Sequence, residues 1–201
     1  MSKTRDRLMT AFGEKVPSVF GDIARRYGFE MRREHDGSCV MESDACRVRV
    51  SLGTGHLADV GVTLSPGKAG RGSSSTEFGL GVVLDDLNDP RVAFAGRPIL
   101  SVEQLDPELR RAAQLLADHC APMLGGNFSI WPELERDSAE RLEQFKKGGE
   151  SRRTWIARQG AFVAFGQGDF REAIARYESI ENHLTPREKK NLEYARQQLQ
   201  A

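Results

Sequence analysis

Two helical segments joined by a short glycine-containing turn, near the end of the chain, constrain its fold more than any other feature. In the second segment, apolar residues recur at the i, i+3, i+4, i+7 spacing of an amphipathic helix, and these are Phe170, Ala173, Ile174 and Tyr177. Between the segments, either Gly166 or Gly168 would end the first helix in a left-handed conformation, and Asp169 would cap the second. The sequence therefore predicts an antiparallel helical hairpin within residues 155–201.

Several residues of this hairpin stand where a known repeat family has its turn, its small packing residue, its aromatic and its closing proline. They are Gly168-Asp169-Phe170, Ala173, Tyr177 and Pro186. On these residues the hairpin resembles one tetratricopeptide-type repeat, a unit of about 34 residues. It departs from the family in the first helix, where Gly160-Ala161 and Ala164 stand in place of the usual Leu-Gly pair and the following aromatic.

A single repeat of this kind leaves its apolar face uncovered. Such arrays need about three units, and no second copy is visible in the sequence. We therefore expect the hairpin to pack on the rest of the chain, on a second subunit to give a homodimer, or on a partner protein. The candidate contact residues are aromatic: Phe128, Trp131, Trp155, Phe162, Phe165, Phe170 and Tyr177. Aromatic side chains anchor many interfaces, although near a domain boundary they more often attach a tail to its own domain.

The composition is that of an ordinary water-soluble protein. The 201 residues are 39% hydrophobic and 29% charged, and the formal net charge is zero, so we expect neither nucleic acid nor an anionic membrane as partner. No apolar run approaches the roughly 18 residues of a membrane span, and the N-terminal residues lack the apolar core of a signal peptide. These features predict a cytoplasmic protein, with Cys39, Cys46 and Cys120 as reduced thiols.

The first two thirds of the chain predict a helix followed by an antiparallel sheet. Residues 3–27 have a helical apolar face that Gly13 and Pro17 interrupt, which predicts a bent helix or two short ones. Four strands follow, at 29–34, 38–42, 45–52 and 57–64. The turn between the first two contains Asp36-Gly37, and the third alternates polar and apolar residues, as in a sheet covered on one side only.

The remaining segments are mostly helical. Residues 76–88 predict a strand that leads into a helical turn. Asp106-Pro107 predicts the start of a helix, with Asp106 as its cap, that covers the sheet as far as residue 121. A charged helix is predicted at 133–147, and the polar run 146–153 is the best candidate for a domain boundary.

These elements predict an α+β fold, in which helices pack on an antiparallel sheet of four or five strands and a helical C-terminal region follows. We place the α+β domain at residues 1–130 and the helical region, with the hairpin, at 131–201.

The candidate chemical sites in the sequence each have a simpler interpretation. The histidines have no metal-ligand spacing, and Asp85-Asp86 reads as a solvated acidic cluster, so we predict no catalytic residue, no metal and no cofactor. The glycine-rich loop 67–73 matches no phosphate-binding motif and predicts a solvated loop. Arg32-Arg33, Arg47 and Arg49 suggest a basic stripe on the exposed sheet face, but the intervening glutamates favour a salt-bridged face.

Two classes of function remain open. The first is a non-enzymatic protein-binding module. Within this class, the order of helix, antiparallel sheet and helical C-terminus, with the stretch 124–134, is similar to small bacterial immunity proteins that neutralise polymorphic toxins. That resemblance implies a cognate toxin as partner. The second class is an enzyme or small-molecule binder with a pocket between sheet and helices, for which Asp85, Asp86 and His119 are the best residues.

Overall fold

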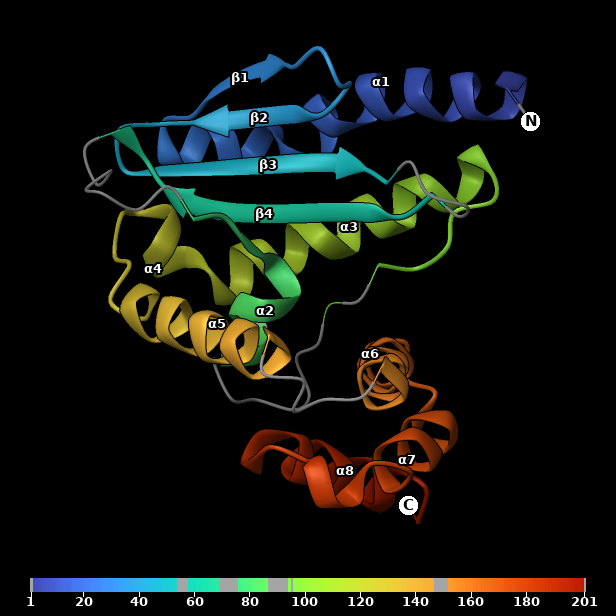
Figure 1. Cartoon of the computed structure of the whole chain (residues 1–201). Helices are drawn as coiled ribbons and strands as arrows, with labels where there is room; N and C mark the ends of the chain where they lie inside the picture. Colours follow the sequence, from blue (N-terminus) through green and yellow to red (C-terminus); the bar gives the residue numbers. More distant parts are fainter. Residues whose placement is uncertain are drawn as a thin grey trace. The chain divides into compact units, whose positions relative to one another are not determined.

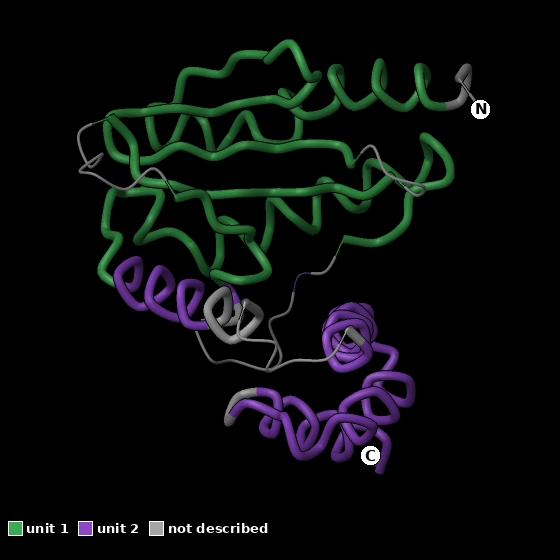
Figure 2. The backbone as a smooth tube through the Cα atoms, in the orientation of Figure 1, with its two compact units in different colours: residues 1–83, 96–129 green, residues 84–95, 130–201 purple. Residues whose placement is uncertain are grey.

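The computed structural model describes residues 2–53, 58–68, 76–86, 94, 96–146 and 152–200. The chain divides into two compact units, which Figure 2 colours separately. Unit 1 comprises residues 1–83 and 96–129, and unit 2 comprises residues 84–95 and 130–201. Within the described ranges, no helix is long and apolar enough to cross a membrane.

Unit 1 is built on a five-stranded antiparallel sheet whose strands follow one another in sequence order (Figure 1). The strands are β1 (Glu30–Arg33), β2 (Cys39–Glu42), β3 (Cys46–Leu52), β4 (Val60–Pro66) and β5 (Phe78–Gly79). The predicted Asp-Gly turn joins β1 to β2: Gly37 has a φ of 83°, and the Asp36 carboxylate accepts hydrogen bonds from both the backbone N–H and the hydroxyl of Ser38. The α+β fold class expected from the sequence is confirmed.

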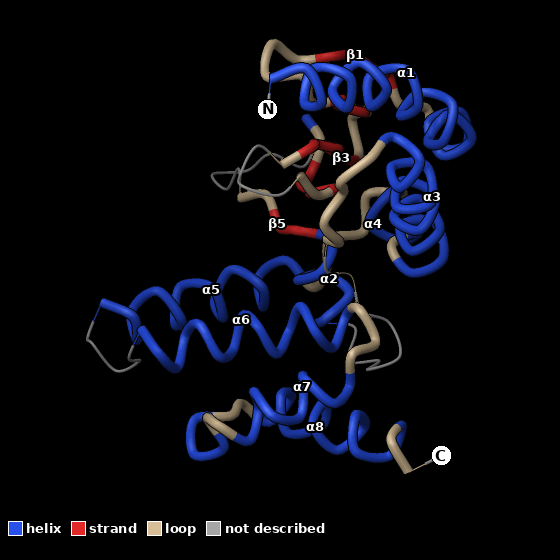
Figure 3. Tube along the Cα trace, turned by 90° about the vertical axis from the view of Figure 1, so that its right-hand side faces the viewer, coloured by secondary structure: helices blue, strands red, loops and turns tan. Residues whose placement is uncertain are grey.

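Helices cover one side of this sheet, as the view in Figure 3 shows. They are α1 (Ser2–Tyr27), α3 (Val102–His119) and the single-turn α4 (Ala121–Leu124). The alternation predicted for the third strand is confirmed, because its apolar residues are buried and the intervening ones are partly exposed. β5 leads directly into α2 (Leu80–Asp86), so the prediction of a strand followed by a helical turn is also confirmed, with a strand of only two residues.

The N-terminal helix is continuous, so the alternative of two short helices is wrong. α1 contains both Gly13 and Pro17. A proline removes one hydrogen bond but leaves the flanking turns intact. Residues on either side of Pro17 share one buried face, on which Phe12, Val16 and Phe20 have no exposed surface. The free energy gained by burying these side chains outweighs the loss of one backbone hydrogen bond. Gly28, with a φ of 66°, ends the helix as predicted.

The helix expected to begin at Asp106 begins earlier, so the prediction of Asp106 as its cap is wrong. The N-cap of α3 is Ser101, and Pro107 lies inside the helix. The first turn is retained because Leu105 is fully buried with the rest of the apolar face. Asp106 instead pairs with Lys15 of α1 at 3.3 Å and with Arg110 at 2.7 Å. The helix also ends before Pro122, at His119, and α4 follows.

Unit 2 is helical. Its elements after residue 130 are α5 (Trp131–Lys146), α6 (Arg152–Gly166), α7 (Phe170–Glu178), the short 3-10 helix η2 (Glu181–His183) and α8 (Pro186–Gln198). The turn between α6 and α7 has Gly168 at φ 75°, and the Asp169 carboxylate accepts from the Glu172 N–H. The predicted hairpin and its cap are therefore present.

The hairpin packs on α8, which covers one of its faces. Ala161, Ala173 and Ala195 are fully buried where the three helices meet, and small residues allow such close approach. The rings of Phe165, Phe170 and Tyr194 lie 5.8–6.0 Å apart in edge-on or tilted contacts.

α8 begins with a capping box, in which Thr185 and Glu188 cap one another. Leu199 follows the last helical residue and is 52% exposed.

Candidate interaction surfaces

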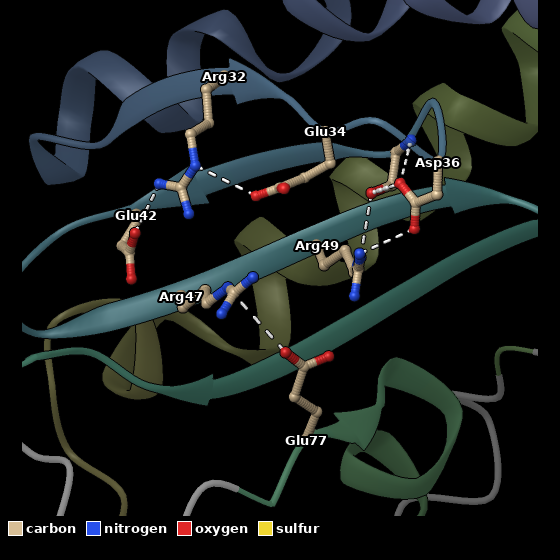
Figure 4. Close-up of polar contacts among 8 residues, drawn as sticks. Arg32, Glu34, Asp36, Glu42, Arg47, Arg49 and Glu77 are labelled. Atoms are coloured by element: carbon tan, nitrogen blue, oxygen red, sulfur yellow. Dashed lines mark hydrogen bonds and ion pairs between the residues drawn. The ribbon is translucent and has the colours of Figure 1, made fainter.

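The outer face of the sheet in unit 1 carries a set of paired charges, drawn in Figure 4. Arg32 on β1 contacts Glu42 on β2 at 2.6 Å and Glu34 at 3.1 Å. Its hydrogen bond holds the pKa of Glu42 below the ordinary glutamate value, although burial acts in the opposite direction. The nearly buried Glu42 is therefore charged, and Arg32 on the adjacent strand neutralises it.

The two arginines of β3 also face carboxylates, Arg49 through hydrogen bonds and Arg47 at a longer distance without one. Arg49 contacts the Asp36 carboxylate at 2.8 Å and the Ser38 hydroxyl at 3.0 Å. The hydrogen bonds from Ser38, and then the charge of Arg49, lower the pKa of Asp36. The Arg47 Nε lies 4.0 Å from Glu77, whose other carboxylate oxygen accepts from the Thr63 hydroxyl at 3.0 Å.

These pairs make the outer sheet face a neutralised surface and not an open basic stripe. The interpretation of a salt-bridged face is confirmed. Val40 on this face is fully buried, and its cross-strand neighbours are Arg32 and Arg49.

The space between the sheet and the helices of unit 1 is filled by apolar side chains. Val48, Leu64, Leu109 and Leu116 have no exposed surface. Burial raises the pKa of the Cys46 and Cys120 thiols to about 12, so neither is a reactive thiolate at neutral pH.

The described part of unit 1 has two hollows beside α1. One hollow lies between α1 and the β1–β2 edge and another between α1 and α3, and His119 lines neither. No group of three potential metal ligands occurs among the described residues. The side chains of Asp85 and Asp86, and most of the loop 67–73, lie outside the described part.

The seven aromatic residues predicted to contact a partner differ in exposure. Trp131, Phe165 and Tyr177 are buried, at 4%, 5% and 1% exposure. Phe128, Phe162 and Phe170 are half-buried. Trp155 is 47% exposed. Within the hairpin, Phe165 and Tyr177 belong to the core shared with α8, and Trp155 is the candidate most available for a contact.

Trp155 belongs to a larger apolar surface on α6. With 3.6 residues per turn, five residues of this helix share one face, and we call them the α6 stripe: Trp155, Ile156, Gln159, Phe162 and Val163. Ile156 and Val163 are 48% and 39% exposed.

Ile156 and Val163 were not among the contact residues expected from the sequence. Apolar residues occur on all sides of α6, so its sequence shows no distinct apolar face. A helix of this kind is usually buried on all sides. The even distribution of apolar residues around α6 was the one sequence feature that marked this helix, and it does not indicate which side is exposed.

Comparisons with protein-family models, with curated proteins and with solved structures found no match for this chain.

Proposed function

We propose that the chain is a non-enzymatic, cytoplasmic protein-binding module that contacts its partner through the α6 stripe. One observation carries the proposal. Of the four large hydrophobic residues exposed in the described part of unit 2, three lie on this one helix face: Trp155, Ile156 and Val163. Single exposed hydrophobics are normal on a protein surface, but several together on one helix are typical of an interaction site.

The helix that presents the stripe is held firmly by its own unit. Its opposite side is packed into the core with α7 and α8, and Arg158 joins it to Glu188 of α8 at 2.6 Å. A rigid helix loses little conformational entropy on binding. An exposed tryptophan beside aliphatic residues also has the composition of an interface hot spot.

The resemblance to immunity-type proteins suggests the class of a heterologous partner, a bacterial toxin. The balanced net charge of the chain favours a target other than a nuclease, whose antagonists are usually acidic. The filled interface between sheet and helices supports surface binding over a small-molecule pocket.

The proposal is tested by affinity capture from the native host, followed by mass spectrometry. The bait is the full chain, either unchanged or carrying Ile156→Ser with Val163→Ser. Leu199→Ser is the matched control, because Leu199 is equally exposed in the same unit but lies off α6. We expect a stoichiometric partner that the double variant loses and the control retains. A partner retained by all three baits would place the binding surface elsewhere.

A further inference from the structure

The α6 stripe is nearly symmetric about its centre. Bulky apolar residues lie three and four positions before Gln159 and three and four positions after it: Trp155, Ile156, Phe162 and Val163. A two-fold axis through Gln159, perpendicular to the helix, exchanges the two pairs. The stripe is therefore complementary to the same stripe on an antiparallel copy of α6, and this self-complementarity is what a two-fold interface requires.

The two ends of α6 carry opposite charge, which suits the same antiparallel arrangement. Arg153 is exposed in a first turn that contains no acidic residue, so it lies near the positive end of its own helix dipole. The other end of α6 carries the negative end of the dipole and is followed by the exposed Asp169. In an antiparallel pair, the positive end of each helix dipole lies beside the negative end of the other, which favours this orientation. Arg153 itself projects about 120° around the helix from Gln159, to the side of the contact face.

We propose that, in the free protein, a second copy of the chain covers the α6 stripe as an antiparallel α6–α6 pair with the two Gln159 side chains facing each other at the two-fold axis. The inference rests on the proposed function, because it names an occupant of the same stripe. Trp155 packs against the partner's Val163, and Ile156 packs against the partner's Phe162. A glutamine amide both donates and accepts, so the two central amides satisfy each other.

The stripe is small, and the dimer is accordingly weak. It offers five residues per copy, whereas an interface of standard size uses about 20–30 residues on each side. The association is therefore in reversible equilibrium at micromolar concentrations, and a tighter heterologous partner displaces the second copy.

Sedimentation of the full chain over a range from low micromolar to submillimolar concentration tests the pairing. We expect a monomer–dimer equilibrium for the unchanged protein and for Leu199→Ser, and a monomer throughout for Ile156→Ser with Val163→Ser. Circular dichroism of the variants checks that the helices are retained. A protein that stays monomeric at every concentration overturns the inference, and so does a dimer that the double variant leaves unchanged.

The antiparallel arrangement has its own test, in cross-linking with a short bifunctional maleimide. Gln159→Cys places the two new thiols together at the axis, so we expect an efficient covalent dimer. Val163→Cys places them eight residues apart along the helices, about 12 Å, and should cross-link poorly. The natural cysteines of the chain are buried and serve as the unreacted background. Efficient cross-linking through residue 163 but not through residue 159 would contradict the arrangement.

The two proposals fail in different ways. If the protein is monomeric but loses a captured partner when the stripe is changed, the second copy is excluded and the binding function stands. If the stripe variants alter neither self-association nor capture, the proposed function itself is wrong.

Discussion

Gly28, directly after α1, and Gly21, inside it, occupy different backbone conformations, so their replacement by alanine should have opposite effects on stability. Gly28 has a φ of 66°, and a Cβ there would meet nothing within 4 Å. Gly28→Ala therefore tests backbone strain alone, and we expect a loss of about 1 kcal/mol in the free energy of unfolding.

Gly21 lies inside the same helix, where a Cβ would make only an ordinary contact with Arg25. Gly21→Ala should raise the free energy of unfolding by about 0.5–1 kcal/mol, because alanine has the higher helix propensity. Urea denaturation followed by circular dichroism measures both changes. Two changes of the same sign would contradict this account of the end of α1.

The lowered pKa of Glu42 predicts a pH dependence. Because the hydrogen bond from Arg32 lowers this pKa in the folded state, the carboxylate stabilises the fold above the unfolded-state pKa, about 4.3. That contribution is lost as the pH falls through the lower, folded-state value. Glu42→Gln should therefore destabilise the protein at pH 7, and its difference from the unchanged protein should shrink as the pH falls toward 3.

Denaturation midpoints at several pH values measure this difference. The exposed Glu14 of α1 provides the control, and Glu14→Gln should change the midpoints little at any pH. A Glu42→Gln difference that stays constant down to pH 3 would show that the ion pair does not lower the pKa.

At the scale of elements, Glu188 has two separate roles in α8. Its side chain accepts from the Thr185 N–H at 2.7 Å, completing the capping box, and it contacts Arg158 of α6 at 2.6 Å. Glutamine preserves the cap but not the ion pair, and alanine removes both.

We expect the stability of the helical unit to follow the order unchanged protein, Glu188→Gln, Glu188→Ala, with a total loss of about 1–2 kcal/mol. Thermal denaturation followed by far-UV circular dichroism measures it. Equal stability of the two variants would show that the ion pair to α6 contributes nothing.

Elements whose signals are local were predictable from the sequence. The Asp36-Gly37 turn, the Gly168-Asp169 turn and the capping box at Thr185 each depend on a few adjacent residues, and each is present. The start of α3 was not predictable, because burial of Leu105 decides it and depends on distant strands. Local chemistry at Asp106-Pro107 pointed to a later start.

The candidate surface was predictable only in part, for a similar reason. Trp155 was expected as a contact residue and is exposed. Ile156 and Val163 were missed because α6 is apolar on all sides, and the packing of α7 and α8 determines which side is left open. Tyr177 has the same aromatic character but lies on the covered side.

At the scale of the whole molecule, self-association through α6 links stability to protein concentration. Only folded copies present the stripe, so dimerisation stabilises the folded state by mass action. Each tenfold increase in concentration above the dissociation constant should add about 1.4 kcal/mol per mole of dimer.

The thermal midpoint of the unchanged protein should therefore rise with concentration, and that of Ile156→Ser with Val163→Ser should not. Leu199→Ser should behave as the unchanged protein does. If the two units unfold in separate transitions, only the transition of the helical unit should shift, because the stripe belongs to that unit alone. A concentration dependence confined to unit 1 would instead place self-association on the sheet or on α1 and α3.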